Sequence, residues 1–451
     1  MDNKRSSFSG KIGFVLAAAG SAVGLGNIWR FPYLAAQYGG GVFLLVYILL
    51  SLTFGFSLMI AEIAIGRKTG QSPIGAFTRL DRRFSFLGYL AALVPVLILP
   101  YYSVIGGWVS KYVFTFLTGG GERAAEDGYF SAFIAQPIEP IGWFFLFLAA
   151  TALIVLFGVN KGIEKVSRVM MPVLAVLVLF VAVYASCMPG AWEGVLYYIT
   201  PDFSRFSYKT VVAALGQLFY SMSLAMGIMI TYGSYMKKEV NLETSVHQIE
   251  IFDTCIAFFA GLMIVPPVFA LSGGTAEALG QGPGLMFVTL PKVFANMTGG
   301  GVIGAIFFLL VLFAALTSAI SLMETIVSTL ADKLHWSRRI CCLAVFAFSL
   351  LLGIPSSLGN GLWSGFLIIG QDILTFFDFI SNSILMPIVA LLTCIFVGYV
   401  IKTKPIEEEV EGSAPFRGKR LFRVVIRYVA PVCLLIILVT AVLGAFGVIN
   451  I

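Results

Sequence analysis

Long apolar runs recur along the whole chain, and most reach the roughly 20 residues that a helix needs to cross a bilayer. Short polar segments with charged residues separate these runs. The pattern predicts an all-α integral membrane protein with about eleven transmembrane helices in one membrane domain over 1–451. The predicted spans are 11–37, 41–66, 86–117, 141–158, 163–187, 208–236, 250–272, 299–330, 340–356, 376–401 and 424–449.

The basic residues indicate how the chain is oriented. With a cytoplasmic N-terminus, all but six of the 29 Lys and Arg residues fall in or beside inside segments. Cytoplasmic loops carry such an excess of positive charge in membrane proteins. We therefore expect a multi-pass protein of the plasma (inner) membrane, with the C-terminus outside after an odd number of spans. The same asymmetry accounts for the net charge of +6, so no nucleic-acid partner is expected.

The composition argues against an enzyme. The chain is 59% hydrophobic and 12% charged. Its six cysteines lie in or at the ends of predicted spans, without the spacing of a metal site or a disulfide framework. No Ser-His-Asp set, HExxH motif or phosphate-binding loop is present.

The first predicted span is interrupted where lipid-compatible residues are expected. Residues 17–32 read AAAGSAVGLGNIWRFP, which includes three glycines, Asn27 and Arg30. A glycine costs a helix about 1 kcal/mol relative to alanine, and a charge at mid-membrane costs at least about 2.5 kcal/mol. Helix-packing glycines are one explanation, but they do not require a neighbouring asparagine.

A second interrupted span lies five helices later. Residues 217–232 read QLFYSMSLAMGIMITY, with small and polar residues inside an apolar run. Five helices later also means the opposite direction across the membrane. Discontinuous helices at matching positions of two inverted halves indicate a binding site near the membrane midplane. Their free carbonyls suit a cation, and their free amides suit an anion.

Several long motifs carry a family resemblance. These are GSAVGLGNIWRFPYLAAQYGGGVFLLVY, YYSVIGGW, ITYGSYMKK, GPGLMFVTLP, AALTSAISLMET and FFDFISNS. Together they resemble the neurotransmitter:sodium symporter family over essentially the whole chain. The resemblance implies a LeuT-type fold of two inverted five-helix repeats, at 11–187 and 208–401, with broken helices 1 and 6 and an extra eleventh helix at 424–449.

The resemblance also implies two sodium sites. The first comprises Ala22, Asn27, Ser221 and Asp253, completed by the substrate carboxylate. The second comprises Gly20, Val23, Ala314, Thr317 and Ser318. Carbonyl, hydroxyl and carboxylate oxygens are the ligands that hard cations prefer.

Asp253 leads to a hypothesis about chloride. Chloride-dependent members obtain a negative charge near the first sodium site from a bound chloride, and Asp253 is expected to supply that charge here. Transport would then not require chloride. The alternative is that Asp253 caps the cytoplasmic end of its span. For Glu62, a second acid inside a span, a functional and a structural role remain open.

The expected substrate is a hydrophobic or aromatic L-amino acid. Gly24 leaves room for a ligand carboxylate at a position where monoamine transporters of the family carry an aspartate. The residues implied to contact substrate are Ala22, Gly24, Gly26, Ile98, Tyr102, Tyr220, Ser221, Ser223, Ala225, Met226, Ser318 and Leu322. Their largely apolar lining favours a hydrophobic side chain. A β- or γ-amino acid remains an alternative.

Two charged pairs resemble the family's gates. Arg30 and Asp378 match the extracellular gate, and Arg5 and Asp332 match the cytoplasmic gate. The cytoplasmic side also has Phe8 where some relatives carry a tryptophan. Gly162 and Pro172 match a pattern at which the fifth helix unwinds, and a simple proline kink is the alternative. The segment GGTAEALGQGPGLMFVTLPKVFANM is expected to form the extracellular lid.

These features predict a sodium-coupled importer that works by alternating access. The lipid bilayer and the amino acid are its expected partners, and the sequence gives no oligomeric state. The rival hypothesis is a transport-inactive amino-acid sensor on the same scaffold.

Overall fold

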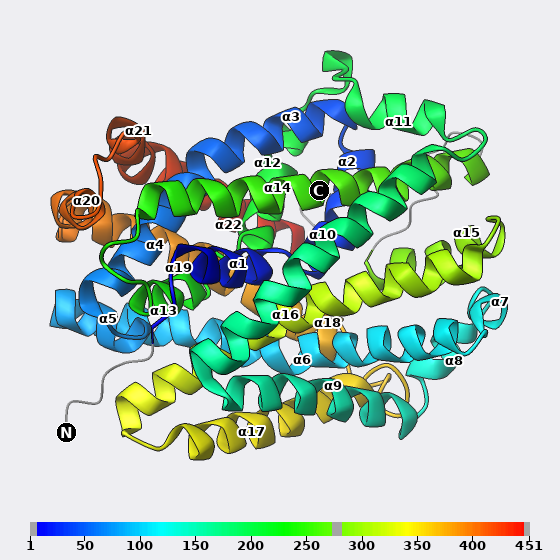
Figure 1. Ribbon diagram of the computed structural model, residues 1–451, viewed down its shortest axis with the longest axis horizontal. Helices are drawn as coiled ribbons and strands as arrows, with labels where there is room; N and C mark the ends of the chain where they lie inside the picture. The colour runs from blue at the N-terminus through cyan, green and yellow to red at the C-terminus, as the bar shows by residue number, and fades with distance from the viewer. Residues whose placement is uncertain (1–6, 273–281, 446–451) are drawn as a thin grey trace.

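The computed structural model describes residues 7–272 and 282–445, which form helices and no strands (Figure 1). Among these residues, nine helical segments are long and apolar enough to cross a membrane: Gly41–Thr69, Arg82–Leu117, Glu139–Leu156, Val159–Ser186, Leu242–Leu271, Gly300–Leu334, Arg338–Leu358, Ile373–Val400 and Lys419–Gly444. A tenth combines α1 (Lys11–Ala22) with Gly26–Gln37, bent by 55°. The remaining predicted span, 208–236, is present as α12 (Tyr208–Ser221) and α13 (Ile228–Ser234).

Six α-helices account for most of the long spans. They are α6 (Ser85–Leu117), α9 (Glu139–Leu156), α10 (Lys165–Ser186), α14 (Leu242–Ser272), α16 (Gly300–Leu334) and α17 (Arg338–Leu358). Other spans pair two helices across a π-helical turn: α3 (Gly41–Leu50) with α4 (Phe56–Thr69), α18 (Ile373–Asp378) with α19 (Met386–Ile395), and α21 (Lys419–Val424) with α22 (Ala430–Ala445). The sequence predicts continuous spans at these positions, because a π-helical turn leaves the apolar pattern unbroken.

Short connecting helices gather at the two ends of the molecule. Figure 1 shows α7 (Gly121–Ala124), α8 (Tyr129–Ile134), α11 (Trp192–Ile199) and α15 (Leu290–Ala295) at one end. The other end carries α5 (Pro73–Leu80) and α20 (Lys404–Glu411). The second group belongs to the segments predicted to face the cytoplasm. Part of the predicted extracellular lid, residues 273–281, lies outside the described residues.

Glycines let α4 and α13, one from each repeat, approach closely. A Cβ added to Gly66 on α4 would lie 1.8 Å from the carbonyl oxygen of Ile230 on α13. One added to Gly233 on α13 would lie 2.3 Å from the carbonyl oxygen of Ile63 on α4. Small residues of this kind allow backbones to touch in membrane helix pairs. The contact fixes α13 beside the first repeat.

One span begins earlier than its apolar run. The sequence predicts a start at residue 250, whereas α14 begins at Leu242. The Asn241 side chain accepts a hydrogen bond from the Thr244 amide at 3.0 Å, which is a helix N-cap contact. The first two turns of α14 are polar, so hydropathy alone does not reveal them.

Candidate functional site

The break in the first span lies in the middle of the molecule. Helix α1 ends at Ala22, Val23 is extended, and helical structure resumes at Gly26. The Gly24 amide donates to the Asn27 side-chain oxygen at 3.1 Å. Asn27 therefore replaces part of the hydrogen bonding that the interrupted helix loses.

The second break is held in a strained conformation. Ser223 and Ala225 have positive φ angles of 52° and 61°, which cost a non-glycine residue roughly 1–2 kcal/mol each. The Ala225 amide donates to Glu62 at 2.7 Å, and the Ser223 hydroxyl donates to the Ser21 carbonyl at 2.8 Å. These contacts compensate the strain and link the two breaks. They support the structural role for Glu62, whose side chain is buried on α4.

The structure brings together three of the four residues predicted for the first sodium site. The Asn27 amide nitrogen donates to Ser221 Oγ at 2.9 Å and to Asp253 Oδ1 at 2.8 Å. Ser221 Oγ donates to both Asp253 oxygens at 3.1 Å. The fourth residue, Ala22, ends α1 and lines the adjoining cavity.

Asp253 is an acidic residue whose hydrogen-bond partners are all neutral. Its side chain is fully buried, and Tyr47 adds a third hydroxyl or amide donor at 3.2 Å. No ion pair among the described residues includes Asp253. A buried carboxylate without a cation is costly, and an oxygen-rich cluster beside it suits sodium. Asp253 lies eleven residues into α14, so the helix-capping alternative is wrong.

The residues of the second predicted sodium site lie where α1 meets α16. The Ser318 hydroxyl donates to the Val23 carbonyl at 3.2 Å, and the Thr317 hydroxyl donates to the Ala314 carbonyl at 3.1 Å. A Cβ added to Gly20 would lie 3.3 Å from the Thr317 Cβ. The five residues therefore form one neighbourhood of carbonyl and hydroxyl oxygens, with no carboxylate among them.

A cavity adjoins Gly24 between the two oxygen clusters. A Cβ at Gly24 would lie 2.8 Å from Ser318 Oγ and 3.2 Å from the Tyr102 hydroxyl. The Tyr102 hydroxyl also accepts from the Leu25 amide at 3.5 Å. Glycine is therefore the residue that keeps this end of the cavity open.

Ten of the twelve predicted substrate contacts line the cavity: Ala22, Gly24, Gly26, Ile98, Tyr102, Tyr220, Ser223, Met226, Ser318 and Leu322. Ser221 and Ala225 do not line it, because their polar groups are turned to Asp253 and Glu62. Sequence reasoning missed Ser21, Leu25 and Ile228, which complete the lining. Each is one or two residues from a predicted contact.

The predicted extracellular gate residues are not in ion contact. The Arg30 guanidinium lies over the Tyr220 ring, 5.3 Å from its centroid. Asp378 instead accepts hydrogen bonds from Tyr101 at 3.1 Å and Asn382 at 2.7 Å. Arg30 thus takes a cation–π contact above the cavity, and Asp378 uses neutral donors.

On the predicted cytoplasmic side, Asp332 accepts from the Ser72 amide at 2.9 Å. Its predicted partner Arg5 lies outside the described residues. Phe8 is buried and packs edge-on against Tyr232 and Tyr235. Phe8 therefore packs among aromatic rings at the position where some relatives carry a tryptophan.

The helix-five motif is split between two kinds of helix. Gly162 lies in the π-helical turn Val159–Glu164, and Pro172 lies inside α10. Glu164 in that turn accepts the Ser9 amide at 2.9 Å and pairs with Arg168 at 2.7 Å. The irregular start of this span is thus tied to the N-terminal segment.

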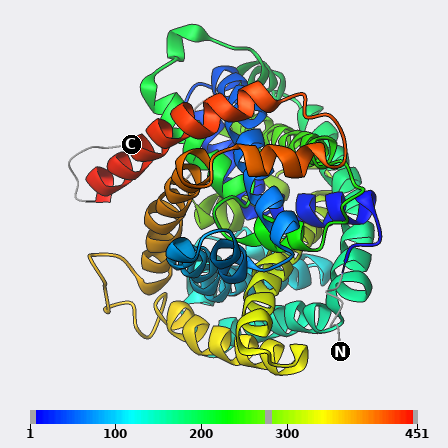
Figure 2. The same cartoon turned by 90° about the vertical axis from the view of Figure 1, so that its left-hand side faces the viewer.

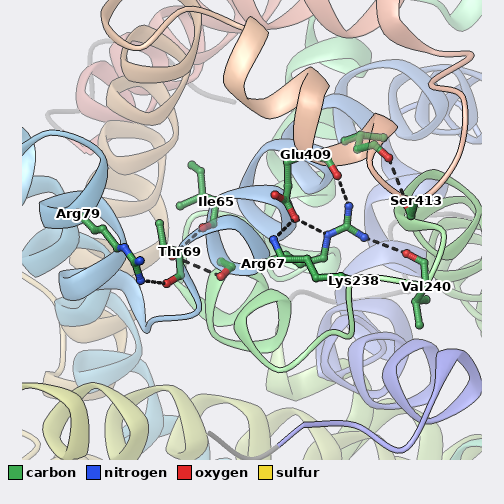
Figure 3. Close-up of polar contacts among 10 residues, drawn as sticks. Ile65, Arg67, Thr69, Arg79, Lys238, Val240, Glu409 and Ser413 are labelled. Atoms are coloured by element: carbon green, nitrogen blue, oxygen red, sulfur yellow. Dashed lines mark hydrogen bonds and ion pairs between the residues drawn. The ribbon is translucent and has the colours of Figure 1, made fainter. Parts of the chain in front are cut away.

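Two buried ion pairs were not predicted. Arg338 binds Glu324 on α16, which is fully buried. Arg67, at the end of α4, contacts Glu409 of α20 through Nε at 2.9 Å and the Val240 carbonyl at 2.8 Å (Figure 3). The buried Arg67 thus joins α20 to the segment between α13 and α14. Glu324 is visible in the sequence as an acid inside an apolar span. Its partner lies on a different helix, and Glu409 is 342 residues from Arg67, so neither pairing follows from the sequence.

Comparisons with known proteins agree with this geometry. A model of the sodium:neurotransmitter symporter family matches residues 5–121 and 136–446. An uncharacterized sodium-dependent transporter, YhdH of Bacillus subtilis (strain 168), is 34% identical over 97% of each chain. A second one, from Haemophilus influenzae, is 32% identical over 97% of this chain and 98% of that protein.

A solved structure matches at the level of the whole fold. The crystal structure of MhsT in complex with L-phenylalanine has a TM-score of 0.88 and 38% sequence identity. The match covers 97% of this chain and 100% of that chain. The predicted fold class, with its broken helices, is confirmed.

Proposed function

We propose that this chain, which belongs to the sodium:neurotransmitter symporter family, imports hydrophobic or aromatic L-amino acids with sodium and without a need for chloride. The family and the matched relatives are transporters and not enzymes, and the chain is a multi-pass, sodium-dependent symporter. The substrate class, the residues that bind sodium and the role of chloride are the parts proposed here.

The observation that carries the substrate class is the open space at Gly24. A carboxylate there would face the Tyr102 hydroxyl, which can donate to it, and the backbone amide of Leu25, which in this structure donates to that hydroxyl. Helix breaks offer such amides to anions. An aspartate at this position would fill the space, so the cavity suits an amino acid better than a monoamine.

The rest of the cavity supports an apolar side chain. Ile98, Met226 and Leu322 line it together with the aromatic ring of Tyr220. Methionine adapts to ligands of different shape. The related MhsT has been crystallised with L-phenylalanine, which agrees with a cavity for large apolar side chains.

Asp253 supports transport without chloride. Its carboxyl group lies beside Asn27 and Ser221 and is buried among neutral donors, where a bound cation would favour the charged form. Sodium entering this cluster would neutralise the carboxylate directly. A chloride beside Asp253 would instead be repelled by a like charge in a low-dielectric site.

Coupling between sodium binding and substrate binding follows from the position of the cavity between the two oxygen clusters. Ser318 lines the cavity and also donates to the Val23 carbonyl of the second cluster. Gly24 lines it and donates to Asn27 of the first. Sodium and substrate therefore order the same backbone segment, so each favours binding of the other. Opening of the cavity to one side at a time completes an alternating-access cycle.

Uptake into proteoliposomes tests the proposal. We would measure radiolabelled tryptophan, tyrosine, leucine and alanine with an inward sodium gradient, and again with potassium in place of sodium. Sodium-dependent accumulation that favours the larger apolar side chains is expected. Binding without accumulation would instead support a sensor, and the absence of binding for all four would refute the proposed cavity.

A further inference from the structure

A basic groove lies where the last two described spans meet α20. Figure 2 shows this end of the molecule, with α20 and α21 in orange and α22 in red. The groove measures about 370 Å³, and five basic side chains line it: Lys402, Lys404, Lys419, Arg423 and Arg427. Three glutamates of α20 also line it.

The acids of the groove are already paired. Arg423 donates to both oxygens of Glu407 at 2.6 Å, and Lys419 contacts Glu411 at 2.7 Å. Burial raises the pKa of Glu407, but hydrogen bonds from Arg423 and Thr403 and the nearby positive charges outweigh it and lower the pKa to about 2. The carboxylate therefore stays charged and paired at neutral pH.

Two cations of the groove have no such partner. Among the described residues, Lys402 takes part in no ion pair. Arg427 uses only Nε, which donates to the Gly398 carbonyl at 3.2 Å. Its two terminal nitrogens have no partner in the part of the chain that the structure describes. A guanidinium fork of this kind suits the paired oxygens of a phosphate.

The groove lies at the depth of lipid headgroups. The span Lys419–Gly444 has 26 residues and is about 39 Å long, longer than the roughly 30 Å hydrocarbon core. All of its charged residues lie in its first three turns, up to Arg427, so the excess length is expected at this end and Arg427 near the boundary. The neighbouring Tyr399 and Tyr428 are 54% and 62% exposed, and tyrosine is enriched at membrane interfaces.

Apolar surface continues beside the groove. Val424 and Val432 on the same span are 51% and 59% exposed, as expected for side chains that contact acyl tails. A charged headgroup site next to apolar surface is matched by a lipid and not by a free ion. Basic clusters at the end of a transmembrane helix bind anionic lipids in this way.

We propose that this groove binds the phosphate of an anionic phospholipid, with Lys402 and Arg427 as its principal contacts. The site is separate from the amino-acid cavity and does not depend on the proposed substrate. Such a lipid would lie against both α20 and the last described span, and so would stabilise their contact.

Native mass spectrometry of the purified full chain tests the site. We would titrate dioleoylphosphatidylglycerol and dioleoylphosphatidylcholine separately and measure the fraction of protein with one bound lipid. Wild type is expected to prefer phosphatidylglycerol. The double variant Lys402→Gln/Arg427→Gln should bind it roughly thirtyfold more weakly and lose the preference. An unchanged preference in this variant would overturn the proposal.

Matched variants separate local from general charge effects. Arg82→Gln/Arg83→Gln removes two exposed basic side chains at the same end of the molecule and should keep the preference. Arg427→Lys keeps the charge but loses the guanidinium fork, so its affinity for phosphatidylglycerol should fall severalfold, less than in the double variant. This single variant also tests the site if the double variant does not fold. Displacement of the lipid by equimolar inorganic phosphate would show a free-phosphate site and contradict the lipid assignment.

Discussion

The two predicted sodium sites would hold the same cation in different ways. The first is built around the buried charge of Asp253, with Asn27 and Ser221 from two other helices. The second is built from neutral groups, the Val23 carbonyl and the hydroxyls of Thr317 and Ser318. Both lie beside the same break in the first span.

The difference has a physical consequence. A buried carboxylate attracts a cation strongly and penalises its loss. Carbonyl and hydroxyl oxygens contribute only dipoles, so the second site depends on how closely α1 and α16 approach. We infer that the first site fixes sodium affinity and anion preference, whereas the second site responds to helix movement.

The largest effect on uptake is expected from removal of the Asp253 carboxylate. Asp253→Asn keeps the side-chain shape and one acceptor oxygen, but it turns the other acceptor into a donor and leaves sodium without a counter-charge, so sodium-dependent uptake without chloride should fall about 100-fold. Uptake into proteoliposomes in gluconate medium measures this. Glu250→Gln removes another buried acid, one turn earlier on α14, and should keep most activity. Equal losses in both variants would show that any buried acid of α14 matters equally.

A somewhat smaller effect is expected at the glycine between the two sites. Gly24→Ala places a methyl group 2.8 Å from Ser318 Oγ and fills the predicted carboxylate space. The KM for amino acid should rise by roughly 30-fold, mainly through steric loss of binding. Gly142→Ala on α9, where a Cβ would meet nothing within 4 Å, is the matched control. An unchanged KM would place the substrate carboxylate elsewhere.

A substitution in the second predicted sodium site, which contains no carboxylate, should have a smaller effect. Thr317→Val removes one hydroxyl at nearly constant volume, and the half-saturating sodium concentration should rise about tenfold with no change in chloride response. Sodium titration of uptake measures both. Thr151→Val is the control, because Thr151 is a buried threonine on α9 whose hydroxyl donates to the carbonyl four residues earlier, as that of Thr317 also does. A new chloride response in Thr317→Val would contradict the division between the two sites.

The smallest effect is expected at Tyr47, which donates a hydrogen bond to Asp253. Tyr47→Phe removes one neutral hydrogen-bond donor to the Asp253 carboxylate, so sodium affinity should fall roughly threefold to tenfold. Tyr198→Phe removes a buried tyrosine hydroxyl that bonds the Phe258 carbonyl instead, and should leave sodium affinity unchanged. A loss in Tyr47→Phe as large as that in Asp253→Asn would mean that geometry and not charge dominates the first site.

The sequence predicts the spans and both breaks because length, apolarity and glycine are local properties. It also predicts which residues gather at Asn27 and Thr317, through long motifs that resemble a known family. These parts agree with the structure at Asp253, which meets Asn27 and Ser221 from other helices.

Contacts between distant segments are what the sequence does not predict. Glu62 is visible as a buried acid, but its bond to the Ala225 amide depends on how α4 packs against the second break. Arg30 and Asp378 match a gate pair, yet each finds a neutral partner in the structure. Pairing of this kind is decided by a few ångströms of helix position, which no motif records.

Chloride replacement tests the central claim most directly. Sodium-dependent binding of the best-transported amino acid would be titrated for wild type and Asp253→Asn, once in chloride and once in gluconate. The account predicts that the half-saturating sodium concentration of wild type is the same in both media, and that chloride partly restores binding to Asp253→Asn. A wild-type sodium affinity that falls about tenfold in gluconate would contradict the role of Asp253 as the built-in negative charge.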